Sequence, residues 1–177
     1  MLHAFTEEET NSLKELMLCR RPNWEILFRL YHDQKLNPMS FLRSEEFLNI
    51  LTECCIKDYP YTPFADAFHT MRSMLLPVLY LMGSEVPKAD VYHAICTGYG
   101  GLLACLGGHV YKKKVLLTEH GIYTREREEE IIRAKWVQPA FKKQWISFFY
   151  MLSDIIYTRA FLVSALFTNA MHAQIQM

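Results

Sequence analysis

The sequence lacks the cysteine patterns of a disulfide-bonded or zinc-binding module. Its five cysteines are an odd number, Cys54 and Cys55 are neighbours, and no pair has CxxC spacing. Small disulfide frameworks use even numbers of cysteines, and zinc modules use closely spaced pairs. The chain is therefore expected to fold around a hydrophobic core in a reducing compartment.

Net charge is also missing. Lys and Arg together number 19, Asp and Glu together number 19, and the formal charge is zero. Chains that bind nucleic acid usually carry a clear basic excess, so no nucleic-acid partner is predicted. The histidines and cysteines have no recognised metal-ligand spacing, so no metal site is predicted. Internal repeats and low-complexity tracts are absent from the sequence as well.

The chain has no long hydrophobic run of the kind that targets or anchors a protein in a membrane. Its first residues are acidic at positions 7–9 and show neither a basic nor an apolar signal region, so export is not expected. The apolar segment 146–167 is interrupted by Asp154 and Arg159, and its aromatic residues recur at helical spacing. This pattern predicts a helix that faces a core rather than a membrane span.

What the sequence does contain is apolar and aromatic material, at 51% and 14% of 177 residues. That length suits one domain with a large core. Residues 1–83 are predicted to be mainly helical: two helices within 7–31, a third capped by Ser40 or Ser44, and a fourth over 64–82 with Pro77 inside it.

From residue 84 the pattern changes to an α/β section that extends to residue 177. Short apolar and partly β-branched runs near 90–94, 115–118 and 161–166 predict buried parallel strands, with helices between them. The fold class is therefore expected to be α/β and partly Rossmann-like, with a helix-rich amino-terminal region.

A glycine-rich turn follows the first predicted strand and leads into a helix. Gly98 and Gly100 would let a ligand approach the backbone, and the free N–H groups of a helix amino terminus favour anions such as phosphate. A plain tight turn is the alternative. His93, on the preceding strand, is a secondary candidate for the same ligand site.

The most informative stretch covers residues 115–130. A strand-like run ends on Glu119 and His120, which places a titratable pair at the carboxyl edge of a parallel sheet, where such sheets bind ligands. His120 could donate a hydrogen bond to a substrate hydroxyl or present its imidazole to a reacting centre, or it could merely tie the loop to the sheet. Glu119 could orient His120, contact the ligand, or cap the turn.

A run of charges follows this pair. Thr124 is expected to cap a helix whose first-turn glutamates complement the helix dipole, and Glu129 and Arg133 are spaced for an ion pair. Arg125 and Arg127 are less expected, because positive charge near a helix amino terminus is unfavourable unless it serves a partner. The planar guanidinium suits phosphate or carboxylate, so one of them is predicted to face the ligand cleft and to contact the phosphate of a donor substrate or an acceptor substrate.

The run 117–131, which reads LTEHGIYTREREEEI, resembles the acceptor-side half of bacterial GT-B glycosyltransferases. The nearest likeness is to the PelF-type transferases of exopolysaccharide synthesis. Further similar segments lie at 90–94, 41–44, 72–77 and 145–150, and the resemblance covers roughly residues 24 to 176.

This resemblance implies a retaining hexosyl transfer in the cytoplasm, either free or at the periphery of the inner membrane. The donor would be UDP-glucose or a related UDP-sugar, used as a substrate without a further cofactor, and the acceptor a growing polysaccharide. The resemblance is also compatible with a membrane-bound export machinery as a further partner. The resemblance places His120 against the donor sugar as the catalytic candidate. The substrate-binding candidates are Glu119, Arg125, Arg127, His93, Gly98 and Gly100.

Such transferases consist of two Rossmann-like halves. By that comparison the donor-binding half would follow Met177, and the first strand with its glycine-rich loop would precede residue 1. Residues 1–177 are therefore expected to form a single partial domain, a fragment inactive alone that needs the missing donor half. The alternative is a non-catalytic sugar-binding or protein-interaction module with a Rossmann-like fold.

Overall fold

The computed structural model describes residues 4–165. The chain forms two compact units, one of Met1–Ser84 with Gln138–Gln144 and the other of Glu85–Val137 with Trp145–Met177. Each is described by itself.

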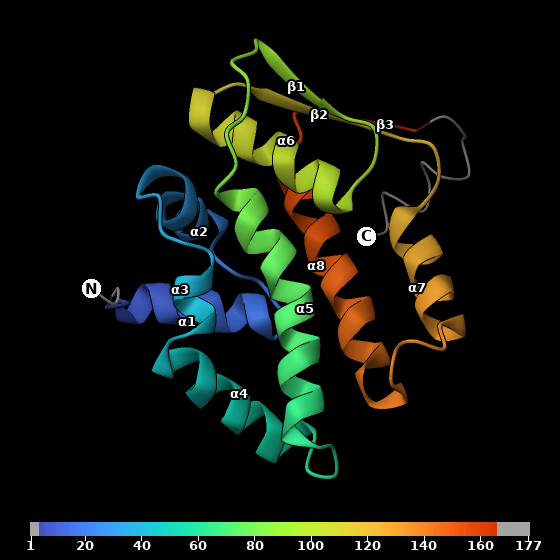
Figure 1. The fold of residues 1–177 in the computed structure, drawn as a ribbon. Coiled ribbons are helices and arrows are strands. Elements are labelled where there is room, and N and C mark those ends of the chain that lie inside the picture. Colours follow the sequence, from blue (N-terminus) through green and yellow to red (C-terminus); the bar gives the residue numbers. More distant parts are fainter. Residues whose placement is uncertain (1–3, 166–177) are drawn as a thin grey trace. The chain divides into compact units, whose positions relative to one another are not determined.

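The first unit is helical (Figure 1). Its helices are α1 (Glu7–Met17), α2 (Trp24–Phe28), α3 (Met39–Leu42), α4 (Glu45–Asp58) and α5 (Phe64–Met82). A π-helical turn, Arg29–Asp33, continues α2. The first unit also contains the short 3-10 turn Pro139–Phe141. The helical content predicted for the amino-terminal region is thus confirmed.

Local capping explains where several of these helices begin. Thr6 and Glu9 form a capping box at the start of α1, in which each side chain accepts a hydrogen bond from the other residue's backbone N–H. Of the two predicted caps for the third helix, Ser44 is the one used before α4, and its hydroxyl accepts from the Phe47 N–H at 3.2 Å. The core beneath includes edge-to-face contacts of Phe47 with Phe41 and with Phe68.

The second unit is built on a parallel sheet with strand order β1-β2-β3. Its strands are β1 (Val91–Ala94), β2 (Lys114–Glu119) and β3 (Leu162–Ala165). The predicted strands and the α/β class are confirmed; residue 166, included in the third predicted strand, lies outside the described residues. Three helices belong to this section: α6 (Gly98–Tyr111), α7 (Tyr123–Arg133) and α8 (Lys142–Arg159). The first three residues of α8, 142–144, belong to the first unit.

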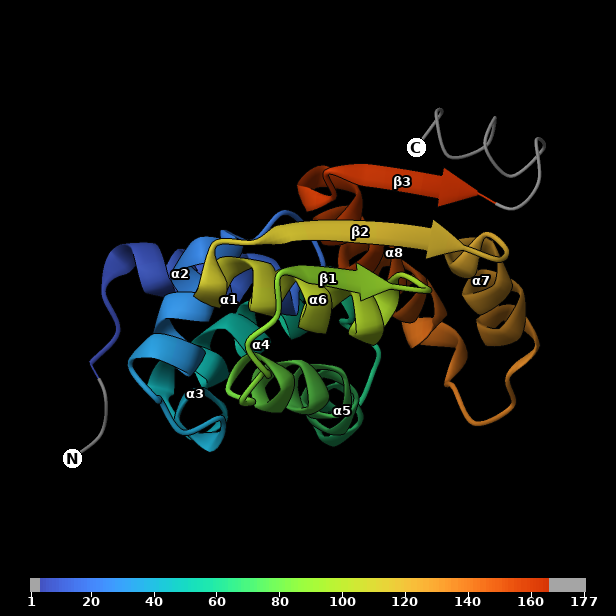
Figure 2. The same cartoon turned by 90° about the horizontal axis from the view of Figure 1, so that it is seen from above.

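Figure 2 shows that α6 and α8 both lie on the same face of the sheet. The strands lie in the sheet in their order along the chain, β1-β2-β3. Because crossover connections between parallel strands are right-handed, the helices of both connections then lie on the same face of the sheet. Because side chains alternate along a strand, Val115 and Leu117 of β2 are buried against these helices. Val91, His93 and Leu162 belong to the opposite face and are exposed. We call this the open face.

The long apolar helix of the sequence is α8, whose buried residues include Phe148, Leu152, Ile155 and Ile156. It therefore faces a core, as its helical spacing predicted. No helix in the described part of the chain combines the length and the apolarity needed to cross a bilayer.

Candidate functional site

The three strands end at the same edge of the sheet because they run in the same direction. β1 ends at Ala94 and is followed by α6, and β2 ends at Glu119 and is followed by α7. Figure 2 shows α7 beyond the arrowheads of the strands. This carboxyl edge is the place where ligands bind to parallel sheets, and most of the residues selected from the sequence lie on it or beside it.

His120 is the first residue after β2 and is exposed. Within the described part of the chain, no hydrogen bond or ion pair joins its side chain to another residue. No contact in this part of the chain therefore supports the alternative role, in which His120 merely ties its loop to the sheet. The imidazole is available to a ligand, and its catalytic role stays a prediction.

Glu119 lies one residue earlier and has the opposite environment. It is 1% exposed, because β2 extends through residue 119 and strand alternation places it on the face covered by helices, with Val115 and Leu117. Its carboxylate accepts a hydrogen bond from the Tyr157 hydroxyl of α8. Burial, together with this hydrogen bond and the nearby carboxylate charge, raises the pKa of Tyr157 above its usual range. Glu119 thus joins the end of β2 to α8, which fits an orienting role better than contact with a ligand.

A row of polar side chains crosses the open face near the carboxyl edge. His93 Nε2 lies 2.9 Å from Thr118 Oγ1, and Thr118 Oγ1 lies 2.7 Å from Ser164 Oγ. Each residue comes from a different strand, and the register pairs Thr118 directly with Ser164. His93 was a candidate from the sequence, whereas Thr118 and Ser164 were not. Strand alternation places each of them on the open face, but only the pairing register brings residues of the three strands together.

The glycine turn before α6 is covered rather than open. Gly98 is buried with φ of 67°, and a Cβ placed on it would lie 2.7 Å from Cζ and Oη of Tyr123. The ring of Tyr123, from the start of α7, therefore occupies the space next to the first glycine that an anion was expected to use. Burial raises the pKa of Tyr123 above its usual value. Gly100 is exposed, with Cys96 Sγ as its nearest neighbour.

Arg125 and Arg127, the two arginines near the start of α7, are engaged within their own helix. Arg125 Nε lies 3.9 Å from Glu129, and Arg127 pairs with Glu130 at 2.5 Å. Arg127 also lies 5.5 Å from the Tyr123 ring centroid. These contacts give the positive charges a local explanation, although both side chains retain solvent exposure and a ligand could compete for them. The predicted pair between Glu129 and Arg133 is confirmed at 3.8 Å.

Thr124 was predicted to cap this helix, and that prediction is wrong. The helix begins at Tyr123, two residues before the start that a Thr124 cap implies, with Ile122 at the cap position and no side-chain capping bond. Thr124 is buried in the first turn instead.

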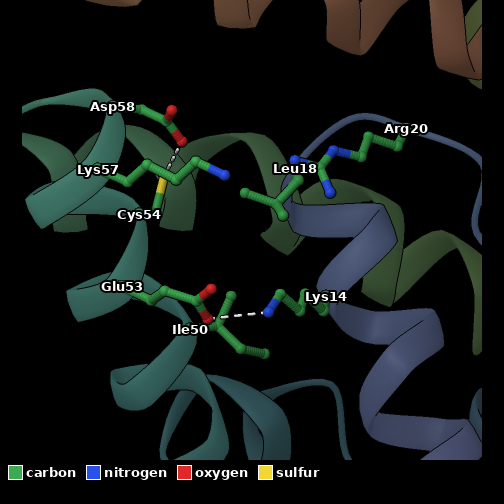
Figure 3. A pocket seen from close by; sticks show the side chains of 8 residues that line it. All are labelled: Lys14, Leu18, Arg20, Ile50, Glu53, Cys54, Lys57 and Asp58. Atoms are coloured by element: carbon green, nitrogen blue, oxygen red, sulfur yellow. Dashed lines mark hydrogen bonds and ion pairs between the residues drawn. The ribbon is translucent and has the colours of Figure 1, made fainter.

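A separate hollow lies in the first unit between α1 and α4 (Figure 3). Its volume is about 70 Å³, and the charged residues that line it include Lys14, Arg20, Glu53, Lys57 and Asp58. Lys14 Nζ pairs with Glu53 at 2.8 Å, and Cys54 Sγ lies 3.8 Å from Asp58. Sites for drug-sized ligands usually have about 300–1,000 Å³, so this hollow is too small for a nucleotide sugar. Over residues 4–165, no three His, Cys, Asp or Glu side chains are grouped to hold a metal ion.

Comparison with known proteins identifies the family. A family model described as "Domain of unknown function (DUF3492)" matches residues 2–177. The chain belongs to the DUF3492 family. Searches among curated proteins and among solved structures found no match. The family model includes both units and the whole carboxyl edge of the sheet.

Proposed function

We propose that this DUF3492 chain is the acceptor-side part of a retaining, UDP-sugar-dependent glycosyltransferase of exopolysaccharide synthesis, similar to the PelF type. Two facts support the proposal. Domains of this family are typically found in glycosyltransferase-like proteins, and the run 117–131 resembles the transferase motif. The proposal includes a cytoplasmic location, a polysaccharide acceptor and a donor-binding half supplied by another polypeptide segment.

The observation that carries the proposal is the position of His120. It is exposed at the carboxyl edge, directly after the central strand of the sheet. In the proposed reaction the oxygen of an acceptor hydroxyl bonds to the anomeric carbon of the sugar, and the hydroxyl proton passes to the departing UDP. The bond from that carbon to UDP breaks, UDP leaves with the bonding electrons, and the configuration is retained. His120 would donate a hydrogen bond to a hydroxyl of the donor sugar and so hold the anomeric carbon in place.

The residues around His120 would position it, and they offer little for binding the phosphates of UDP. Glu119 and Tyr157 hold the end of β2 against α8, so they would position His120 rather than contact the sugar. Arg125 and Arg127 are paired with Glu129 and Glu130, which leaves little free positive charge on α7 for a diphosphate. The proposal therefore assigns the phosphates of UDP mainly to the donor half.

The same ion pairs favour a second candidate function. A module that binds sugar or another protein without turnover needs no phosphate-binding arginine and no reactive carboxylate. The engaged arginines and the buried Glu119 suit such a module as well as they suit half of an enzyme. The candidates differ in whether His120 matters for UDP release or only for binding.

The test supplies a donor-binding half in trans and measures UDP release from UDP-glucose in the presence of an oligosaccharide acceptor. His120→Ala is expected to lower UDP release about tenfold or more, the loss that corresponds to one hydrogen bond worth about 1.5 kcal/mol. His120→Gln, which keeps a donor, should recover part of it. His69→Ala is the matched control, because His69 is also exposed but lies on α5.

Equal UDP release by the wild type and His120→Ala would remove the catalytic role of His120. If neither protein releases UDP, but the chain alone binds the oligosaccharide by calorimetry and loses this binding in His120→Ala, the non-catalytic module is the better description. Absence of both activities would contradict both candidates.

A further inference from the structure

The amino edge of the sheet, opposite to the carboxyl edge, combines exposed apolar residues with a lysine run. β2 begins at Lys114, directly after Lys112 and Lys113, and β3 begins directly after Phe161. The Phe161 N–H donates to the Val115 carbonyl at 2.8 Å, which fixes Phe161 beside the start of β2. Lys114 Nζ then lies 3.6 Å from the centroid of the Phe161 ring.

Three apolar side chains at this edge are exposed to an unusual degree. Phe161 is 66% exposed, Leu162 57% and Val91 47%. The register pairs Val91 with Lys114, and Leu162 with Leu116 two residues further along β2. These residues therefore form one surface, which we call the amino-edge patch: Val91, Lys112, Lys113, Lys114, Phe161 and Leu162.

The patch is positively charged although the whole chain is neutral. Lys113 pairs with Asp90 at 3.1 Å. Within residues 4–165, no carboxylate pairs with Lys112 or Lys114. The carboxyl end of α6 attracts positive charge and explains Lys112, the residue that follows it. It does not explain why Lys114 lies over an exposed phenyl ring, or why Leu162 and Val91 remain in solvent.

We propose that the amino-edge patch docks the protein onto an anionic lipid surface. The lysines would lie at the level of the lipid phosphates, and Phe161, Leu162 and Val91 would enter the boundary between headgroups and acyl chains. A lipid surface fits better than a second protein. Specific protein interfaces bury about 1,200–2,000 Å², far more than three side chains provide, whereas lysines near an anionic membrane each add attraction without a shaped partner.

The position of the patch has a consequence for the rest of the second unit. β2 runs from Lys114 at the patch to Glu119 at the carboxyl edge, a length of about 20 Å at roughly 3.3 Å per residue. Docking through the amino edge leaves His120 on the side away from the lipid. The inference does not depend on the proposed function, because no residue of the patch lies at the carboxyl edge.

Flotation of the full chain with vesicles tests the inference. Vesicles of phosphatidylcholine mixed with phosphatidylglycerol should carry the protein, phosphatidylcholine alone should not, and added salt should weaken the binding. Replacing Lys112 and Lys114 by Gln should lower the partition coefficient about fivefold per lysine, which corresponds to about 1 kcal/mol each. Phe161→Ser should weaken binding at every salt concentration.

The matched controls are Lys135→Gln and Trp136→Ser, an exposed cation and an exposed aromatic residue elsewhere in the second unit. They should bind vesicles like the wild type. Circular dichroism and thermal unfolding establish that each variant is folded. Absence of vesicle binding, equal binding to neutral vesicles, or equal loss in the control variants would overturn the inference. Self-association that the patch variants abolish, without vesicle binding, would assign the patch to a protein contact instead.

Discussion

A half-buried tyrosine, Tyr157, and a fully buried one, Tyr31, have opposite hydrogen-bonding situations. The hydroxyl of Tyr157 donates to Glu119, whereas the Tyr31 hydroxyl, in the π-helical turn that follows α2, has no hydrogen-bond partner among residues 4–165. Burial raises the pKa of both phenols above the usual range. A buried hydroxyl without a partner costs free energy, and a buried carboxylate that loses its donor costs more.

Removal of the two hydroxyl groups should therefore change stability in opposite directions. Tyr157→Phe is expected to lower the free energy of unfolding by about 1–3 kcal/mol, because the Glu119 carboxylate loses a donor in a buried environment. Tyr31→Phe should leave stability unchanged or raise it by about 1 kcal/mol, since the ring stays and an unsatisfied hydroxyl disappears. Urea denaturation measures both variants, with Tyr61→Phe on the surface as the control. The same loss in Tyr157→Phe and Tyr61→Phe would show that the contact with Glu119 adds no stability.

The buried thiol of Cys105 is expected to contribute to a loss of stability at alkaline pH. Burial raises the pKa of this thiol from the ordinary 9.0 to about 12, and the positive charge of Arg159 opposes the shift only partly. The neutral thiol is therefore favoured in the folded state, and the associated stability is complete below pH 9 and is lost as the pH rises from 9 to 12. In this pH window one thiol lowers the free energy of unfolding by about 1.4 kcal/mol per pH unit.

Chemical denaturation at several pH values between 8 and 11 measures this slope. The free energy of unfolding of Cys105→Ala should fall less steeply with pH than that of the wild type, by the slope that one thiol contributes, about 1.4 kcal/mol per pH unit. Leu106→Ala controls for lost packing, because it removes a fully buried neighbour and should lower stability by about 2–5 kcal/mol equally at all pH values. Parallel curves for Cys105→Ala and the wild type would exclude Cys105 as the titrating group.

At the scale of single elements, the turn into α6 depends on one glycine. Gly98 adopts φ of 67° and lies against the Tyr123 ring, so an alanine there meets both backbone strain and a steric clash. Gly98→Ala should cost about 1–3 kcal/mol from the backbone alone, and more with the clash. In a Tyr123→Ala background its cost should fall, because only the backbone part remains.

Gly100→Ala provides the matched comparison for this turn. Gly100 lies in the same first turn of α6, is exposed, and does not have positive φ. A Cβ at this position would lie 3.3 Å from the side chain of the exposed Cys96, which can shift slightly, so alanine should change stability by no more than about 1 kcal/mol. Thermal unfolding of the single and double variants distinguishes the cases. Equal effects of alanine at positions 98 and 100 would contradict the covered turn.

The elements could be predicted from the sequence where one local signal dominates. The strand positions followed from short apolar runs, and Ser44 was among the expected caps because its side chain can reach the third helical N–H. The sequence failed where a distant contact decides. Thr124 was a good cap by residue type, yet the helix begins at Tyr123, whose ring packs against Gly98 of α6. For Glu119 the sequence left an orienting role, a ligand contact and a turn cap open, and its strand parity with Val115 and Leu117 indicated the covered face.

The polar row of His93, Thr118 and Ser164 shows a second limit. Its members lie on three strands separated by long stretches of sequence, and only the pairing register brings them together. Register depends on how the crossovers pack, which residue types alone do not specify. The same holds for the amino-edge patch, where Phe161 lies beside Lys114 through the pairing of β2 and β3.

At the scale of the second unit, helices cover one face of the sheet, and successive strand positions should therefore differ sharply in their tolerance of charge. Leu117 of β2 is on the covered face and is 1% exposed, while Leu162 of β3 is on the open face. Leu117→Lys places a charge among apolar residues and should cost more than about 3 kcal/mol, enough to unfold much of the protein. Leu162→Lys should change stability by no more than about 0.5 kcal/mol.

Urea denaturation of both lysine variants measures this difference, with Leu162→Ala and Leu117→Ala separating the effect of charge from lost packing. If a donor half or another polypeptide covers the open face in the assembled enzyme, Leu162→Lys should leave the isolated chain stable and still reduce UDP release in the two-part assay. A large loss of stability in Leu162→Lys alone would show that the open face is already covered by this chain in solution. An unchanged reaction rate with a stable variant would show that assembly does not use this face.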